Sequence, residues 1–170
     1  MFPVQSWQPR TYPGTSAAVM GLFSGLHTKV AVYMLYRLYV QLFDLEQRWN
    51  VMIIVIMIIS MMIGAFGGLA ENSIRRVLGY QMLNGMPFIL VMLAFTSDDP
   101  RRALAAGIMY TIHHMLTVGS LILASGAIEE TYGTGLLSKL SGLARRDPII
   151  AWIFAAGAFS VVGFPPFSGM

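Results

Sequence analysis

The sequence contains no cysteine, which excludes disulfide bonds, thiolate metal sites and cysteine nucleophiles. Charged residues are also scarce: Asp, Glu, Lys and Arg make up only 11% of the 170 residues, whereas about a quarter is usual for soluble domains. In their place, 56% of the residues are hydrophobic, and the mean hydropathy is +0.65. The composition therefore predicts a polytopic membrane protein and gives no sign of a soluble domain.

The net charge is +3, and the basic residues lie between the apolar stretches. We interpret this pattern as a topology signal and not as a nucleic-acid surface. If the N-terminus defines one side, that side collects Arg10, Arg75, Arg76, Lys139, Arg145 and Arg146, and the other collects Arg37, Arg48, Arg101 and Arg102. The positive-inside rule then assigns the N-terminal side to the cytoplasm.

Stretches long enough to cross a bilayer occur at about 16–42, 51–69, 77–95 and 103–128. Proline-broken segments at 1–15 and 148–170 flank them, with Pro3, Pro9 and Pro13 in the first and Pro165 and Pro166 in the second. Proline interrupts helices, and paired interrupted helices point to inverted-repeat transporters, although prolines also mark ordinary loop entry. The expected fold is all-α: a transmembrane helix bundle, part of an inverted-repeat transporter with discontinuous helices at both ends.

Lys29 lies near the middle of the first predicted span. A lysine at that depth is costly, so it is expected to face protein or water. One interpretation is a proton-relay lysine that releases its proton near the working pH. The other is a structural lysine paired with a carboxylate from outside this chain, since no span here carries a central Asp or Glu. We favour the relay, because ionisable residues inside membranes are functional by default.

Other polar residues extend this candidate site. Tyr33 lies one turn after Lys29 and shares its helical face, whereas Tyr36 and Arg37 are expected to reach the membrane interface. His113 and His114 lie near the centre of the fourth span and are candidate proton-relay residues, because histidine can both give and take a proton. The alternative, which stays open, is a neutral histidine that forms a hydrogen bond between helices. They point about 100° apart, so only one can face a given channel, and a two-histidine metal site is not expected.

The remaining polar positions have simpler interpretations. Thr117 can hold water along the fourth span, although such residues more often serve helix packing. His27 is expected to have a packing role. Five acidic residues outside the spans are expected to be solvated loop charges; they are Glu71, Asp98, Asp99, Glu129 and Glu130.

Several stretches together resemble the antiporter-like proton-translocating membrane subunits. This family includes subunits of NADH–quinone oxidoreductase, membrane-bound hydrogenases and Mrp-type Na⁺/H⁺ antiporters. The stretches are PVQSWQPRTYPG, SAAVMGLFSGLHTKVAVY, ENSIRRVLGYQMLNGM, MYTIHHMLTVGSLILASG and LSKLSGLARRDPIIAWIFAAGAFSVVGFPPFSGM. The paired histidines and the GFPPFSGM ending are most similar to the D-type subunits of Mrp antiporters. The resemblance implies a partial antiporter domain over 1–170, from the end of the family's seventh helix to the start of its twelfth.

The resemblance also implies roles for single residues. Lys29 matches the family's eighth-helix lysine on a central hydrophilic axis, and His114 matches its eleventh-helix histidine. The family usually carries a further lysine one turn later, where this chain has Val118. That departure removes one relay group from the expected channel lining of Tyr33, Thr117 and Val118.

Three functions stay open at this point. The first is an ion-translocating subunit of a multi-subunit Na⁺/proton antiporter in the cell (inner) membrane. The second is a proton-pumping subunit of an NADH–quinone oxidoreductase or hydrogenase complex, and the third is a non-transporting structural subunit. In each case we expect a multi-pass, non-enzymatic chain with integral membrane partners and a lipid surround. We expect no nucleic acid, no metal and no cofactor besides the translocated H⁺ or Na⁺.

Overall fold

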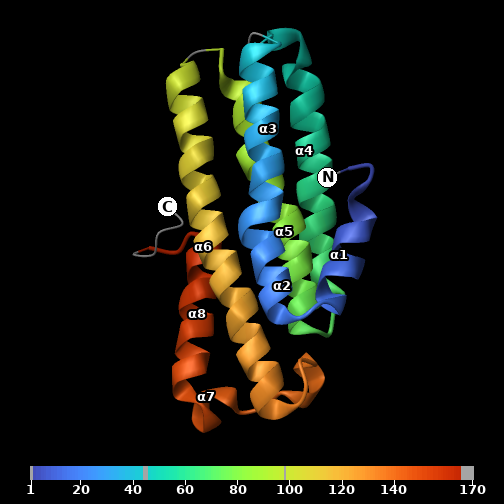
Figure 1. Ribbon diagram of the computed structural model, residues 1–170, viewed down its shortest axis with the longest axis vertical. Coiled ribbons are helices and arrows are strands. Elements are labelled where there is room, and N and C mark those ends of the chain that lie inside the picture. The colour runs from blue at the N-terminus through green and yellow to red at the C-terminus, as the bar shows by residue number, and fades with distance from the viewer. Residues whose placement is uncertain (1, 44–45, 98, 166–170) are drawn as a thin grey trace.

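The computed structural model describes residues 2–43, 46–97 and 99–165, and in these ranges the regular elements are all helices. Figure 1 shows α3, α4, α5 and α6 running along the long axis of an elongated bundle, with α8 beside the lower half of α6. In chain order the elements are η1 (Gln5–Trp7), α1 (Gln8–Thr11), η2 (Tyr12–Gly14), α2 (Ala17–Leu22), η3 (Phe23–His27), α3 (Thr28–Gln41), η4 (Gln47–Trp49), α4 (Asn50–Leu69), α5 (Ile74–Leu90), η5 (Val91–Phe95), α6 (Pro100–Tyr132), η6 (Leu137–Lys139), α7 (Leu143–Arg146) and α8 (Pro148–Val162).

Within those ranges, four helical stretches are long and apolar enough to cross a membrane. They are Ala17–Gln41, Gln47–Leu69, Ile74–Phe95 and Pro100–Tyr132. The prediction of a polytopic helix bundle is therefore confirmed. The shorter α8 has 15 residues, or about 22 Å at 1.5 Å per residue, which is less than the hydrocarbon thickness of a bilayer.

The helix α6 is longer than its predicted span of 103–128. Asp99 caps its start by accepting a hydrogen bond from the Arg102 amide at 3.2 Å, and Pro100 occupies the first turn. The helix ends only at Gly133, whose φ of 67° suits glycine as a left-handed cap. Glu129 and Glu130 therefore lie on the last turn of a helix, and the prediction that they are loop charges is wrong.

The N-terminal segment consists of short helical turns that pack on α5. Extended backbone at Thr15 and Ser16 separates these turns from α2, and the Ser16 hydroxyl caps α2 by accepting from the Val19 amide. Pro9 is buried, Pro13 is half-buried, and Pro3 is exposed. At the other end Pro165 follows α8, and Pro166 lies outside the described residues. A transport role for these breaks stays a prediction.

Two apolar clusters fill the bundle. The first includes Tyr12, Met20, Ile74, Leu78, Met82, Val118, Leu121, Ile122 and Ile128. The second includes Val32, Tyr36, Tyr39, Met57, Met86, Ile89, Leu90 and Leu93. Each of the three helical stretches 17–41, 74–95 and 100–132 passes from one cluster to the other. The junction between the two clusters is where the polar residues of the candidate site lie.

Candidate functional site

Lys29 is buried at this junction, with 7% of its surface exposed. It is the second residue of α3, and α3 directly follows η3, a π-helical turn from Phe23 to His27. Such turns are rare and often occur at functional sites. The Lys29 ammonium donates to the carbonyl oxygen of Ser24 at 2.7 Å and to the Thr28 hydroxyl at 3.3 Å. Two of the hydrogen-bond partners of the amine therefore lie on its own helical stretch.

The third partner of the ammonium comes from α6. The Lys29 Nζ lies 3.0 Å from Nδ1 of His114, whose side chain is almost fully buried. Because an ammonium has only donors, Nδ1 must act as acceptor, and we infer the neutral tautomer with its hydrogen on Nε2. The two residues are 85 positions apart in the sequence, so this contact depends on how α3 and α6 pack.

The backbone of α5 holds the imidazole from the other side. Gly85 lies between Met82 of the first cluster and Met86 of the second, and a Cβ at Gly85 would overlap Nε2 and Cδ2 of His114. Nδ1 is opposite the Nε2–Cδ2 edge of the ring. The imidazole is therefore held between Gly85 and Lys29, and glycine is the residue that leaves room for it.

Neutral acceptors surround the buried charge. Among the described residues no carboxylate forms an ion pair with Lys29, and its three partners are a carbonyl, a hydroxyl and an imidazole nitrogen. Two buried atoms at this layer, Nε2 of His114 and Oγ of Ser24, have no hydrogen-bond partner in the described part of the chain. The layer therefore has unused hydrogen-bonding capacity next to the Lys29–His114 pair.

A cavity of about 330 Å³ extends from Lys29 along the groove between α3 and α6. Tyr33 and Arg37 line it, with the Arg37 guanidinium 5.9 Å from the centre of the Tyr33 ring, and Thr111 lines it from α6. Tyr36 also lines it but is only 8% exposed, because its hydroxyl donates to the Ile89 carbonyl at 2.5 Å. The expectation that Tyr36 reaches the interface is therefore wrong, since this hydrogen bond holds it in the second cluster.

The other predicted site residues lie on the same helix as His114. His113 is half-buried, and its Nδ1 lies 3.4 Å from the hydroxyl of Thr117. Val118 is fully buried in the first apolar cluster. His27 is exposed with its ring edge against Phe23. Channel roles for Tyr33, Thr117 and Val118 stay predictions.

One charged pair was missed by sequence reasoning. Arg75 at the start of α5 contacts both carboxylate oxygens of Glu129, at 2.9 and 2.7 Å, and each side chain is only 20% exposed. The same guanidinium donates to the carbonyl of Thr15, at the break before α2. It therefore ties three segments together. Nothing local in the sequence marks a pair 54 residues apart; only the packing of α5 on α6 reveals it.

Comparison with known proteins places this chain in a family. The family described as NADH:quinone oxidoreductase/Mrp antiporter, TM, matches residues 1–170. The chain is 32% identical to the D-type subunit of the Na⁺/H⁺ antiporter of Alkalihalophilus pseudofirmus, covering 99% of this chain and 34% of that protein. It is 28% identical to the N-type subunit of the NADH-quinone oxidoreductase of Parvibaculum lavamentivorans, covering 98% of this chain and 34% of that protein.

A solved structure shows the same arrangement of helices. The chain superposes on a chain of the Mrp complex from Dietzia sp. DQ12-45-1b with a TM-score of 0.94 and 42% identity, covering 99% of this chain and 31% of that one. It thus spans about a third of the length of the relatives that it matches. With a family match along its whole length, the chain belongs to the NADH:quinone oxidoreductase/Mrp antiporter transmembrane family.

Proposed function

We propose that this chain is the ion-translocating part of a membrane subunit in a multi-subunit Na⁺/proton antiporter, and that Lys29 and His114 relay protons. The observation that carries the proposal is the hydrogen bond of 3.0 Å between Nζ and Nδ1, buried between two apolar clusters. A buried contact of this kind lets a proton move without crossing lipid. The relative named as a D-type subunit of a Na⁺/H⁺ antiporter and the similar chain of an Mrp complex support this choice.

The proposed step moves one proton along that hydrogen bond. The Lys29 ammonium gives its proton to Nδ1 of His114, leaving a neutral amine and an imidazolium. No described protein group accepts from Nε2, so the imidazolium must give its Nε2 hydrogen to a water molecule. The neutral ring then keeps the hydrogen on Nδ1, and the proton has passed from one edge of the ring to the other. Two positive charges only 3.0 Å apart would repel by about 5 kcal/mol at an effective dielectric constant near 20. The pair therefore holds one extra proton at a time, as a relay needs.

The cavity beside Lys29 is the proposed route by which the amine is reprotonated. It reaches Lys29 between α3 and α6, and its walls carry the Tyr33 and Tyr36 rings and Thr111. Water in such a cavity can deliver a proton to Nζ when the ring has taken the previous one. Tyr33, which is 60% exposed, and Arg37 lie one and two helical turns after Lys29 on α3.

A second candidate is a proton-pumping subunit of an NADH–quinone oxidoreductase complex, which the similarity to an N-type subunit of such a complex supports. The same relay would serve both, because the buried pair is independent of what drives transport. In either case we propose a multi-pass chain of the cell (inner) membrane whose partners are other integral membrane subunits. In either case we also propose that the chain transports ions and catalyses no reaction itself.

The test is Lys29→Ala in the complete subunit within its complex. Proton transport in everted vesicles, followed by fluorescence dequenching on sodium addition, should fall on the order of 100-fold, a typical contribution of a positioned proton-transfer group. Lys139→Ala, which removes an exposed lysine of η6, is the matched control and should transport normally. A native gel should show unchanged assembly for both variants, and full transport by Lys29→Ala would refute the relay.

A further inference from the structure

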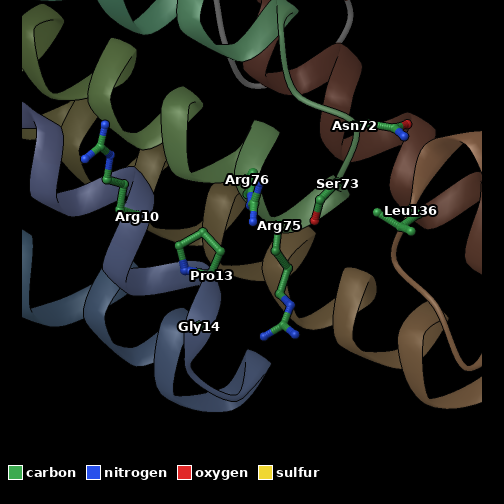
Figure 2. Close-up of a pocket in the computed structure, with 8 residues that line it drawn as sticks. All are labelled: Arg10, Pro13, Gly14, Asn72, Ser73, Arg75, Arg76 and Leu136. Atoms are coloured by element: carbon green, nitrogen blue, oxygen red, sulfur yellow. The ribbon is translucent and has the colours of Figure 1, made fainter.

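A second cavity of about 310 Å³ lies at the N-terminal end of α5, and three arginines line it. Figure 2 shows the lining residues, which come from the N-terminal segment, from the turn before α5, from the first turn of α5 and from the loop after α6. Arg10 lies in the first of these segments, and Arg75 and Arg76 lie in the first turn of α5. The lining contains no acidic residue.

The three arginine side chains differ in how many hydrogen bonds and ion pairs they form within the protein. Arg75 is held by Glu129 and by the Thr15 carbonyl, so it is part of the scaffold. Arg76 has only a longer contact of 3.5 Å with Glu71, and its side chain is 61% exposed. Arg10 is exposed and forms no ion pair with a described residue. Two guanidinium groups at this cavity are therefore available to a ligand.

Arg76 lies where a positive charge destabilises the helix. The positive end of the helix dipole favours acidic residues in the first turn of a helix, and α5 has none there. Arg75 is compensated by Glu129, whereas the exposed Arg76 is compensated only weakly. Helix stability therefore does not account for the arginine at this position.

The cavity lies next to the starts of two candidate membrane spans. Its residues Gly14 and Ser73 come just before the candidate spans that begin at Ala17 and Ile74. Large apolar side chains are exposed nearby, with Trp7 one turn before Arg10 and Leu69 at the end of α4. A phosphate at the arginines would thus have apolar surface beside it for acyl chains, on the side that the basic residues assign to the cytoplasm.

We propose that this cavity binds an anionic phospholipid headgroup, with Arg10 and Arg76 supplying the positive charge that attracts it. Guanidinium groups bind phosphate oxygens through paired, charge-assisted hydrogen bonds. Arg75 also lines the cavity, and its ion pair with Glu129 holds it in place. The site is separate from the Lys29–His114 pair, so it can be present or absent whatever the relay does.

Native mass spectrometry of the complete membrane protein in detergent tests this site. Phosphatidylglycerol and phosphatidylcholine with the same acyl chains are titrated separately onto the wild type and onto the double variant Arg10→Gln/Arg76→Gln. We expect the wild type to prefer phosphatidylglycerol, and the double variant to bind it about 30-fold more weakly, because each basic residue near the surface contributes several-fold. Both substituted side chains are exposed, so the melting temperature should be unchanged.

The double variant Lys139→Gln/Arg145→Gln is the matched control. It removes two exposed cations from the same end of the bundle but outside the cavity, and it should bind phosphatidylglycerol like the wild type. Equal binding by the Arg10/Arg76 variant, or an equal loss in the control, would overturn the proposal. Displacement of the lipid by an equal concentration of inorganic phosphate would assign the site to a free anion and would also overturn it.

Discussion

Replacing Gly85 by alanine should break the Lys29–His114 contact without touching either residue. A Cβ at this position overlaps the Nε2–Cδ2 edge of the imidazole, and the opposite edge already lies 3.0 Å from Lys29 Nζ. A hydrogen bond shortens to only about 2.7 Å, so the ring has roughly 0.3 Å of free movement toward the amine. Ordinary carbon contacts need a shift of roughly 1 Å or more. The ring must therefore turn out of its place, or α5 must move away.

Either response has a measurable cost. Overpacking of this kind costs about 1–3 kcal/mol, and loss of a charged hydrogen bond adds about 1.5–3 kcal/mol. We therefore expect Gly85→Ala to destabilise the protein by about 3 kcal/mol and to reduce proton transport to near the level of Lys29→Ala. Thermal unfolding in detergent and transport in everted vesicles measure the two effects on the same preparation.

Gly119→Ala is the control for the general effect of removing a helical glycine. Gly119 lies in α6 near His114, and a Cβ there meets no atom within 4 Å. We expect a stabilisation of up to about 1 kcal/mol and normal transport. A Gly85→Ala protein with wild-type transport and melting temperature would show that the imidazole does not rest on α5, and the account of the site would be refuted.

The remaining predictions concern two residues of α6, Glu129 and Val118. Glu129→Gln should destabilise the protein by about 2 kcal/mol, because it leaves the half-buried Arg75 without its carboxylate; Glu130→Gln, an exposed neighbour, should change the melting temperature little. Val118→Lys should reduce the yield of folded complex on a native gel, because it places an unpaired charge in the first apolar cluster. The control variant Val118→Ile should assemble normally. Normal assembly of Val118→Lys would contradict this prediction and would show a hydrated environment at this position.

The sequence predicted the fold well for a simple physical reason. Each span is an apolar run long enough to cross a bilayer, and hydropathy reports that property directly. Lys29 and His114 were also visible, because a polar residue inside an apolar run stands out without any knowledge of packing. The bounds were less accurate at α6, where Gly133 and not the charge of Glu129 ends the helix.

The contacts between helices could not be predicted from the sequence. The direct hydrogen bond between Lys29 and His114 depends on the rotation of α3 and α6 and on the room left by Gly85. The burial of Tyr36 depends on the Ile89 carbonyl, and the Arg75–Glu129 pair depends on α5 packing against α6. The π-helical turn before Lys29 has no periodic signal that separates it from an α-helix. Each of these features depends on the packing between helices or on local hydrogen-bond geometry, which hydropathy does not report.

The central claim is that Lys29 and His114 act as one proton-carrying unit, and a double-mutant cycle on transport tests it most directly. Lys29→Ala, His114→Gln and the double variant are compared in the complete subunit at equal assembly. The account predicts that the double variant transports about as slowly as either single variant, as happens for residues that act together. If each single change lowers transport about 100-fold and the double change lowers it about 10,000-fold, the two residues act independently and the claim is contradicted.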